Sequence, residues 1–269
     1  MKIVFMSGDH LRHRYVADSL ISCGAEITWI IEKREDKIPK IPNKLNQNLK
    51  RLFQYHFKKR LLAENFYFKN AGIKSIEKMN EIINIKKNDL NKKKLNDKLK
   101  KIKPDILISY GCHKLNEKFL KNSKICWNLH GGLSPWYRGA ITHFWPSYML
   151  EPQFTGMTLH TTTKQIDGGD IIHQTGIKLK KSDGIHDNAC KALLNFCKEF
   201  PGILKKNMKK INRLKPIKPV TSGRIWTTKM WHPALLEFIY DKHKDKINNY
   251  CIKNKIITRK PILKSIFKK

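Results

Sequence analysis

The sequence predicts an α/β fold: a doubly wound, Rossmann-like, mostly parallel sheet with a small C-terminal appendage. Two observations support this prediction. The chain opens with an apolar run at 2–7, a helical pattern at 11–21 and a β-branched run at 25–31, which is the β-α-β order of a parallel sheet. Residues 105–110 (DILISY) then form a run without polar alternation, as expected of a central strand buried on both faces.

The remaining patterns continue this order. Residues 33–69 are expected to form a loop or helical excursion, and residues 72–103 a strongly basic helix. Further helices are predicted at 116–121, 141–150 and 184–206, and further strands at 125–129, 154–162 and 171–179. Two prolines within Lys215–Pro219 mark a linker. We therefore divide the chain into a main domain (1–210) and a small C-terminal region (211–269) that could serve in dimerisation.

Length and composition limit the class of protein. Of 269 residues, 40% are hydrophobic and 10% aromatic, so the chain can bury a core and is not wholly disordered. No stretch approaches the roughly 18 consecutive apolar residues of a membrane span. The apolar start is too short for a secretory address, so we expect a cytoplasmic protein. Six cysteines without a CxxC pair indicate reduced thiols, with no zinc site or disulfide framework.

The chain is strongly basic, with 55 Lys and Arg against 22 Asp and Glu and a net charge of +33. The excess lies on the flanks: +14 over residues 1–103 (25 basic, 11 acidic), +3 over 104–200 (11 and 8) and +16 over 201–269 (19 and 3). Lys outnumbers Arg, whereas phosphate recognition favours the planar, bidentate guanidinium of Arg. We therefore interpret the charge as a solvated, Lys-rich surface in preference to a nucleic-acid footprint.

The nearly neutral middle third holds the candidate reactive residues. Asn128 and His130 are two residues apart at the end of a predicted strand, so their side chains leave on the same side. In open α/β sheets, ligands bind at the carboxyl ends of such strands. Further along, Gly156–Thr162 (GMTLHTT) leads to Asp167, which a Gly-Gly pair follows in a tight turn. The turn after the first predicted strand is not G-x-G-x-x-G, so the dinucleotide fingerprint is absent.

These motifs together resemble the N10-formyltetrahydrofolate-dependent formyltransferases. The matching patterns are N-x-H-x-x-L-x-P-x-Y-R-G from Asn128, then T-G-x-T-x-H about 25 residues on, then D-x-G-D-I from Asp167. The resemblance covers roughly residues 80–180, and it is strongest to the nucleotide-sugar N-formyltransferases. It implies that residues 1–210 are a formyltransferase catalytic domain with N10-formyltetrahydrofolate as co-substrate and without a metal.

By this resemblance, Asn128, His130 and Asp167 are the catalytic residues, and the chemistry explains their types. When a neutral amine attacks the formyl carbon, negative charge develops on the carbonyl oxygen. An amide donor and an imidazole can stabilise that oxygen by about 3–4 kcal/mol per donor. The Asp carboxylate would hold the His tautomer and accept the proton that the amine loses.

The same resemblance places the folate against two loops, largely through backbone groups. One loop follows the strand predicted at 105–110, and the other precedes Asp167. The residues nominated to bind formyltetrahydrofolate are Cys112, His113, Lys114, Leu115, Thr163, Lys164, Gln165 and Ile166. The adjacent Cys112 and His113 also suit a metal or a Cys/His nucleophile, but no third ligand or base is patterned around them. A role as pocket wall is therefore favoured.

The acceptor is expected to contact two further segments. The candidate residues are His10, Arg12, His13, Trp136, Tyr137 and Arg138. Arg12 and His13 follow the first strand at a helix N-terminus, where a pyrophosphate would be stabilised; the alternative is a solvated helix start. Arg138 could meet a substrate phosphate or form a salt bridge that locks its turn.

Three functions remain open. The first and favoured one is transfer of a formyl group to the amino group of a dTDP- or GDP-linked amino-dideoxy sugar for a surface polysaccharide. The second is a methionyl-tRNA formyltransferase, which is disfavoured because only about 50 residues follow the linker, too few for the five-stranded C-terminal barrel of those enzymes. The third is a non-catalytic, basic protein that binds RNA or a membrane surface, which the complete set of Asn128, His130 and Asp167 argues against. Glycinamide ribonucleotide formyltransferases have near 200 residues and are therefore shorter than this chain.

Overall fold

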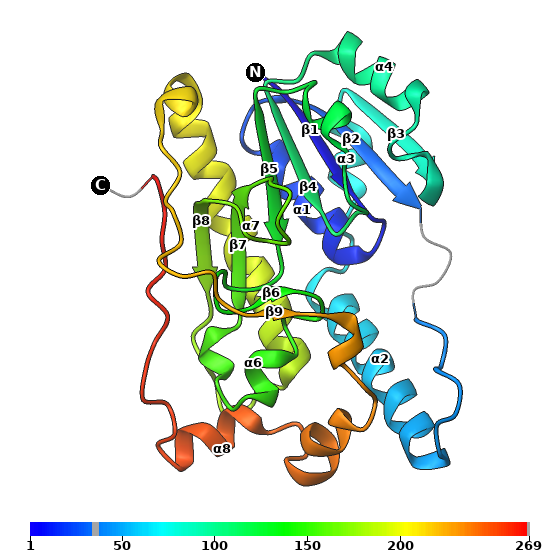
Figure 1. Ribbon diagram of the computed structural model, residues 1–269, viewed down its shortest axis with the longest axis vertical. Helices are drawn as coiled ribbons and strands as arrows, with labels where there is room; N and C mark the ends of the chain where they lie inside the picture. Colours follow the sequence, from blue (N-terminus) through cyan, green and yellow to red (C-terminus); the bar gives the residue numbers. More distant parts are fainter. Residues whose placement is uncertain (34–37, 268–269) are drawn as a thin grey trace.

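A seven-stranded sheet forms the centre of the computed structural model, which describes residues 1–33 and 38–267 (Figure 1). The strand order is β3-β2-β1-β4-β5-β7-β8. The strands are β1 (Lys2–Ser7), β2 (Glu26–Lys33), β3 (Glu81–Lys86), β4 (Ile106–Tyr110), β5 (Ile125–His130), β7 (Gly156–Thr161) and β8 (Ile171–Gly176). Neighbours among β1 to β5 pair in parallel, and β7 pairs antiparallel to β5 and to β8. The expected mostly parallel α/β sheet is confirmed.

The sheet is doubly wound because each central strand is apolar on both faces. Ile3 and Phe5 of β1 pack into one core cluster with residues of the covering helices, whereas Val4 and Met6 pack into a second cluster on the opposite face. This alternation follows from the two-residue period of a strand. The helices are α1 (Leu11–Ile21), α2 (Gln47–Tyr67), α3 (Ile73–Lys78), α4 (Lys93–Ile102), α5 (Glu117–Leu120), α6 (Trp145–Tyr148), α7 (Ile185–Asn207) and α8 (Ile247–Lys253).

Helices α1 and α7 cover one face of the sheet, and α4 and α5 cover the other. The helix predicted at 184–206 corresponds to α7, which continues through Pro201. Its first turn is closed by Asp187, whose Oδ2 accepts a hydrogen bond of 2.9 Å from the backbone N–H of Gly184. Asn46 caps the N-terminus of helix α2, because its side chain accepts from the backbone N–H of Leu49 at 2.9 Å.

The prediction of one basic helix over residues 72–103 is wrong. This segment contains α3, the strand β3 and α4 in succession. Strand β3 (EIINIK) contributes Ile82, Ile83 and Ile85 and pairs in parallel with β2 at the edge of the sheet. The sequence pattern did not reveal this strand, because the segments around it are rich in Lys and Asn. Its β-branched residues favour a strand, but an edge strand is only partly buried and therefore shows no long apolar run.

The C-terminal region runs along the main domain and pairs with it at several points (Figure 1). Ile217, inside the predicted linker, bridges to Ile171 of β8, and Ser265 bridges to His173. Strand β9 (Ile225–Trp226) pairs in parallel with β6 (Arg138–Gly139). A third core cluster joins residues of this region, such as Leu236 and Ile239, to α2 and α6. The domain boundary and the dimerisation role stay predictions.

The helices within 1–33 and 38–267 are all too short or too polar to cross a lipid bilayer.

The turn between β7 and β8 needs glycine at residue 169. A Cβ atom there would collide with the backbone carbonyl of Thr161, so we expect Gly169→Ala to lower the free energy of unfolding by about 1–3 kcal/mol. The matched control is Gly202→Ala, because a Cβ atom at this exposed position of α7 meets nothing within 4 Å. We expect the control to be neutral or stabilising by up to about 1 kcal/mol. Thermal and urea unfolding measure both, and equal stability of the two variants would contradict this account.

Candidate active site

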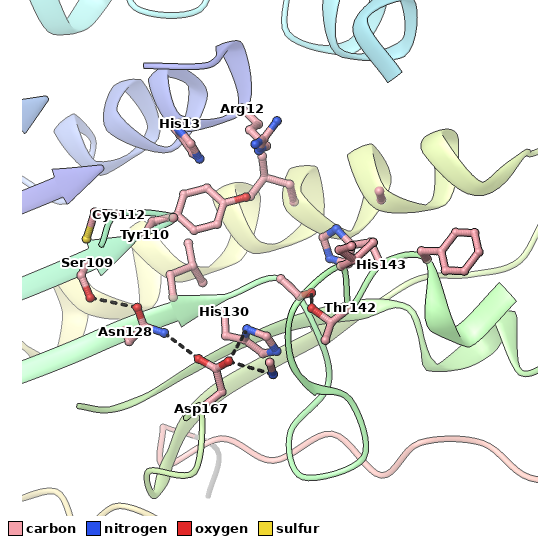
Figure 2. Close-up of a pocket in the computed structure, with 18 of the residues that line it drawn as sticks. Arg12, His13, Ser109, Tyr110, Cys112, Asn128, His130, Thr142, His143 and Asp167 are labelled. Atoms are coloured by element: carbon pink, nitrogen blue, oxygen red, sulfur yellow. Dashed lines mark hydrogen bonds and ion pairs between the residues drawn. The ribbon is translucent and has the colours of Figure 1, made fainter. Parts of the chain in front are cut away.

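The strand register brings the three predicted catalytic residues together. Asn128 and His130 lie two residues apart on β5, and His160 of β7 is the direct cross-strand partner of Asn128. The loop between β7 and β8 turns back toward β5 and places the carboxylate of Asp167 beside both β5 side chains (Figure 2). Asp167 has a φ of +43°, a left-handed conformation that Asp tolerates better than most residues.

Donors surround the Asp167 carboxylate. Its Oδ2 accepts from the backbone N–H of Gly139 at 2.9 Å and lies 3.3 Å from Nδ1 of His130. Its Oδ1 accepts from Nδ2 of Asn128 at 3.1 Å and lies 3.4 Å from Nε2 of His160. Burial alone would raise the pKa of Asp167, but the two histidines and the Gly139 N–H outweigh it and lower the pKa to about 2. The group is therefore an anion at neutral pH.

His130 is held at both ring nitrogens. Its Nε2 lies 2.8 Å from the backbone carbonyl of Tyr137, which can only accept, so this nitrogen carries a hydrogen. Its Nδ1 faces Asp167. Burial lowers the pKa of His130, and the negative charge of Asp167 opposes that effect. When the ring takes up a proton, both nitrogens have an acceptor, so the His130–Asp167 pair can receive a proton without rearranging.

The amide of Asn128 is oriented by its neighbours. Ser109 of β4 donates to Oδ1 at 2.9 Å, which turns Nδ2 toward Asp167 and His160. Nδ1 of His160 faces the carbonyl of Thr161 at 2.8 Å and therefore carries a hydrogen, and its Nε2 lies 3.2 Å from Asn128 Nδ2. The amide group expected to stabilise an oxyanion is thus engaged with Asp167 and His160.

A cavity of about 630 Å³ extends over this cluster, a volume typical of small-molecule sites. The three residues predicted to be catalytic line it. The predicted ligand-binding residues that also line it are Arg12, His13, Cys112, His113, Lys114, Leu115, Thr163, Lys164, Gln165 and Ile166. Cavity-lining residues that sequence reasoning did not select include His56, Arg60, Glu64, Ser109, His143, His160, His186 and Trp231. Of these, only His160 lies inside one of the three motifs that resemble the formyltransferases, as the last residue of T-G-x-T-x-H.

The two loops nominated for the folate form one part of the cavity wall. The loop after β4 is anchored by Glu32, a buried residue of β2 whose Oε1 lies 2.8 Å from Nδ1 of His113 and whose Oε2 accepts from the His113 backbone N–H at 3.2 Å. On the second loop, Lys164 pairs with Glu117 at 2.6 Å. Among residues 1–33 and 38–267, no group of three or more His, Cys, Asp or Glu side chains is arranged to hold a metal ion.

Four of the predicted acceptor-binding residues do not line this cavity. They are His10, Trp136, Tyr137 and Arg138. The guanidinium of Arg138 donates to the carbonyl of Ile166 through Nε at 2.9 Å and Nη2 at 2.6 Å, and through Nη1 to the carbonyl of Ser222. Arg138 therefore locks the loop that carries Asp167, although to backbone carbonyls and not through the salt bridge that the sequence suggested.

The aromatic residues next to Arg138 serve in packing. The hydroxyl of Tyr137 donates to Glu151 at 2.7 Å, and its ring stacks on Trp226. Trp136 packs edge-on against Phe154 with ring centroids 5.3 Å apart. The stack of Tyr137 on Trp226 ties the segment after β5 to the C-terminal region.

The depressed pKa of Asp167 links stability to pH. The pKa is about 2 in the folded protein against 3.8 in the absence of its partners, so the ionised carboxylate contributes about 2 kcal/mol to the free energy of unfolding above pH 4. This contribution is lost as the pH falls from about 4 to about 2. We expect Asp167→Asn to be less stable than the parent at pH 7 and to approach it in stability at acidic pH. Urea unfolding across this range tests the prediction, and a difference independent of pH would contradict it.

Comparison with known proteins identifies the family. The formyl transferase family matches residues 1–192 of the chain. The bifunctional polymyxin resistance protein ArnA of Wigglesworthia glossinidia brevipalpis is 35% identical over 156 residues, which make up 56% of this chain and 23% of that protein. The methionyl-tRNA formyltransferase of Thermotoga maritima is 32% identical over 133 residues, 48% of this chain and 41% of that protein. The matched segments thus span less than half the length of these two relatives.

The fold is also similar to that of a solved sugar 3N-formyltransferase, WlaRD, whose structure was determined in the presence of dTDP and 5-N-formyl-THF. The TM-score is 0.50 with 19% sequence identity, over 86% of this chain and 72% of that chain. At this identity the likeness concerns the fold alone. The family match covers most of the chain and includes the β5 and β7 strands, with Asn128, His130 and Asp167, so the chain belongs to the formyl transferase family.

Proposed function

We propose that the protein transfers a formyl group from N10-formyltetrahydrofolate to the amino group of a nucleotide-linked amino-dideoxy sugar, in the synthesis of a surface polysaccharide. The observation that supports this most strongly is the coupled pair His130–Asp167, with Asn128 beside it, in the wall of a cavity of about 630 Å³. The residues on the two loops, 111–115 and 162–166, line the same cavity and would hold the formyl donor. The donor supplies the formyl carbon and a nitrogen leaving group.

In this proposal the His130–Asp167 pair accepts the proton that the acceptor amine loses. As the acceptor nitrogen forms its bond to the formyl carbon, it must lose one proton, and the ionised Asp167, directly or through water, is the base that takes it. The imidazole of His130 and the amide of Asn128 are the donors proposed to stabilise the charge on the formyl oxygen. The bond from the formyl carbon to the donor nitrogen then breaks, and that nitrogen receives the proton. The formyl group and the proton are therefore both accounted for, and the reaction needs no further reactant.

A nucleotide sugar is preferred to tRNA as the acceptor for two reasons. The site lies in a cavity of the size that suits a small molecule. The +33 net charge lies mainly outside residues 104–200, which carry Asn128, His130 and Asp167 and only +3. The structurally similar WlaRD, named a sugar 3N-formyltransferase, agrees with this choice. The cytoplasmic location and the homodimer remain predictions.

The catalytic assignment is tested by substitution of its charged members. We expect His130→Asn and Asp167→Asn each to lower kcat by about 10²–10³ or more, because each removes a group that acts on the developing charges. Asp97→Asn is the matched control, because Asp97 is a partly exposed residue of α4 that does not line the cavity, and it should retain the parent rate. Circular dichroism verifies that all three variants fold. A rate within tenfold of the parent for either site variant would refute the assignment.

The acceptor is tested with a panel. The protein is incubated with N10-formyltetrahydrofolate, 3-amino and 4-amino sugars linked to dTDP or GDP, and charged initiator tRNA. Mass spectrometry should detect one added formyl group on a nucleotide sugar. Formylation of the tRNA alone would replace the proposal with methionyl-tRNA formyl transfer. RNA binding with a steep salt dependence and no formyl transfer to any acceptor would instead indicate a non-catalytic, basic binding protein.

A further inference from the structure

Three polar rings from distant parts of the chain meet at one wall of the cavity. They are His56 of α2, His186 in the first turn of α7 and Tyr240 in a π-helical segment of the C-terminal region (Glu237–Lys242). Nδ1 of His56 lies 2.8 Å from the Tyr240 hydroxyl, and the same hydroxyl lies 3.3 Å from Nε2 of His186. The two imidazoles line the cavity, whereas Tyr240 is set back from it.

All three rings are neutral at physiological pH. Burial, with the charge of Arg60 as a second cause, lowers the pKa of His56 to about 3. Burial also lowers the pKa of His186 well below its usual value, and it raises the pKa of Tyr240. Each imidazole therefore has one N–H and one bare nitrogen, and the hydroxyl has one hydrogen to donate.

The hydroxyl couples the tautomers of the two histidines. Because it donates to one imidazole, it accepts from the other. A backbone group of His56 near the His186 ring raises the pKa of His186 against the effect of burial, as a carbonyl acceptor does. Because Nε2 of His186 faces Tyr240, we assign the hydrogen that faces this backbone group to Nδ1, which leaves Nε2 bare to accept from the hydroxyl. The hydroxyl oxygen then accepts from Nδ1–H of His56, which leaves Nε2 of His56 bare.

The surroundings of His56 suit a sugar ring. Phe57 and Trp231, which also line the cavity, have ring centroids 5.0 and 6.1 Å from that of His56. Apolar ring faces of this kind pack against the C–H faces of a sugar. Two nearby guanidiniums share one buried carboxylate, because Arg12 donates to Glu64 at 2.5 Å and Arg60 lies 3.8 Å from the same group. The bare nitrogen of His56 is thus a neutral hydrogen-bond acceptor in a wall of rings.

We propose that the His56–Tyr240–His186 chain determines acceptor specificity: it holds His56 with Nε2 as an acceptor, which selects a sugar hydroxyl whose ring lies against Phe57 and Trp231. The inference rests on the proposed function, because it names how the acceptor of that reaction is held. His56 contacts the acceptor, and Tyr240 is a positioning residue that acts through His56.

The tautomer is tested on the ligand-free parent protein. Long-range ¹H–¹⁵N NMR spectra at neutral pH distinguish the two tautomers of each histidine, with His56→Gln and His186→Gln providing the assignments. We expect both His56 and His186 to carry hydrogen on Nδ1. In Tyr240→Phe the His56 signals should move toward a mixture of tautomers, because the bond that fixes Nδ1–H is gone. A parent protein with hydrogen on Nε2 of His56 would overturn the proposal.

Specificity is tested with the nucleotide sugar of the panel that has the highest kcat/KM. We expect Tyr240→Phe to raise the acceptor KM about tenfold, the worth of one hydrogen bond, with kcat and the KM of the formyl donor within about twofold of the parent. His56→Phe keeps a ring in the wall and should show the same split. Tyr55→Phe is the matched control, since it removes a hydroxyl from a half-exposed ring 5.1 Å from that of Tyr240.

The outcomes separate this proposal from the proposed function. An unchanged acceptor KM in Tyr240→Phe and His56→Phe, with an active parent, overturns the specificity role alone. A parent that formylates none of the nucleotide sugars contradicts the function itself. If Tyr240→Phe does not fold, as judged by circular dichroism, the parent tautomer and His56→Phe still decide the question.

Discussion

The ionised carboxylate of Asp167 is the interaction on which the site depends. It gathers Asn128, His130, His160 and the backbone N–H of Gly139 around one buried anion. These groups come from the three strands β5, β6 and β7, so the carboxylate fixes their relative positions. Burial would by itself favour a neutral acid, and only the convergence of donors keeps the group charged. The same contacts that organise the cluster therefore also keep Asp167 ionised at neutral pH.

The position of Asp167 depends in turn on Arg138. Its guanidinium holds the carbonyl of Ile166, directly before Asp167, and that of Ser222 in the C-terminal region. The strand pair β6–β9 adjoins this contact and joins the two segments through backbone hydrogen bonds. The C-terminal region therefore helps to orient the loop that carries Asp167. It also supplies Trp231, which lines the cavity, and Tyr240, which contacts His56. This region contributes to the site although it carries none of the recognisable motifs.

The distribution of charge acquires a physical meaning in the fold. Helix α4, in the basic first third of the chain, covers the face of the sheet opposite to α1 and α7. The cavity combines neutral imidazoles and aromatic rings with the charged residues Arg12, Arg60, Lys114, Lys164, Glu64 and Asp167. Most of the net charge of +33 therefore lies outside the cavity.

The sequence by itself predicted six of the seven strands of the main sheet and the helices α1 and α7, and it nominated Asn128, His130 and Asp167 as the catalytic residues. Strand and helix periodicity and motif spacing are local properties, so they can be identified along the chain. Strand β3 was missed because its partial burial at the sheet edge is set by β2, not by its own composition. Only the tertiary structure decided that Arg138 holds carbonyls and that His160 faces Asn128. It also joined His56, Tyr240 and His186, which lie 184 and 54 residues apart in sequence. Contacts over such separations leave no local pattern, because each residue satisfies its hydrogen bonds only once the chain has folded.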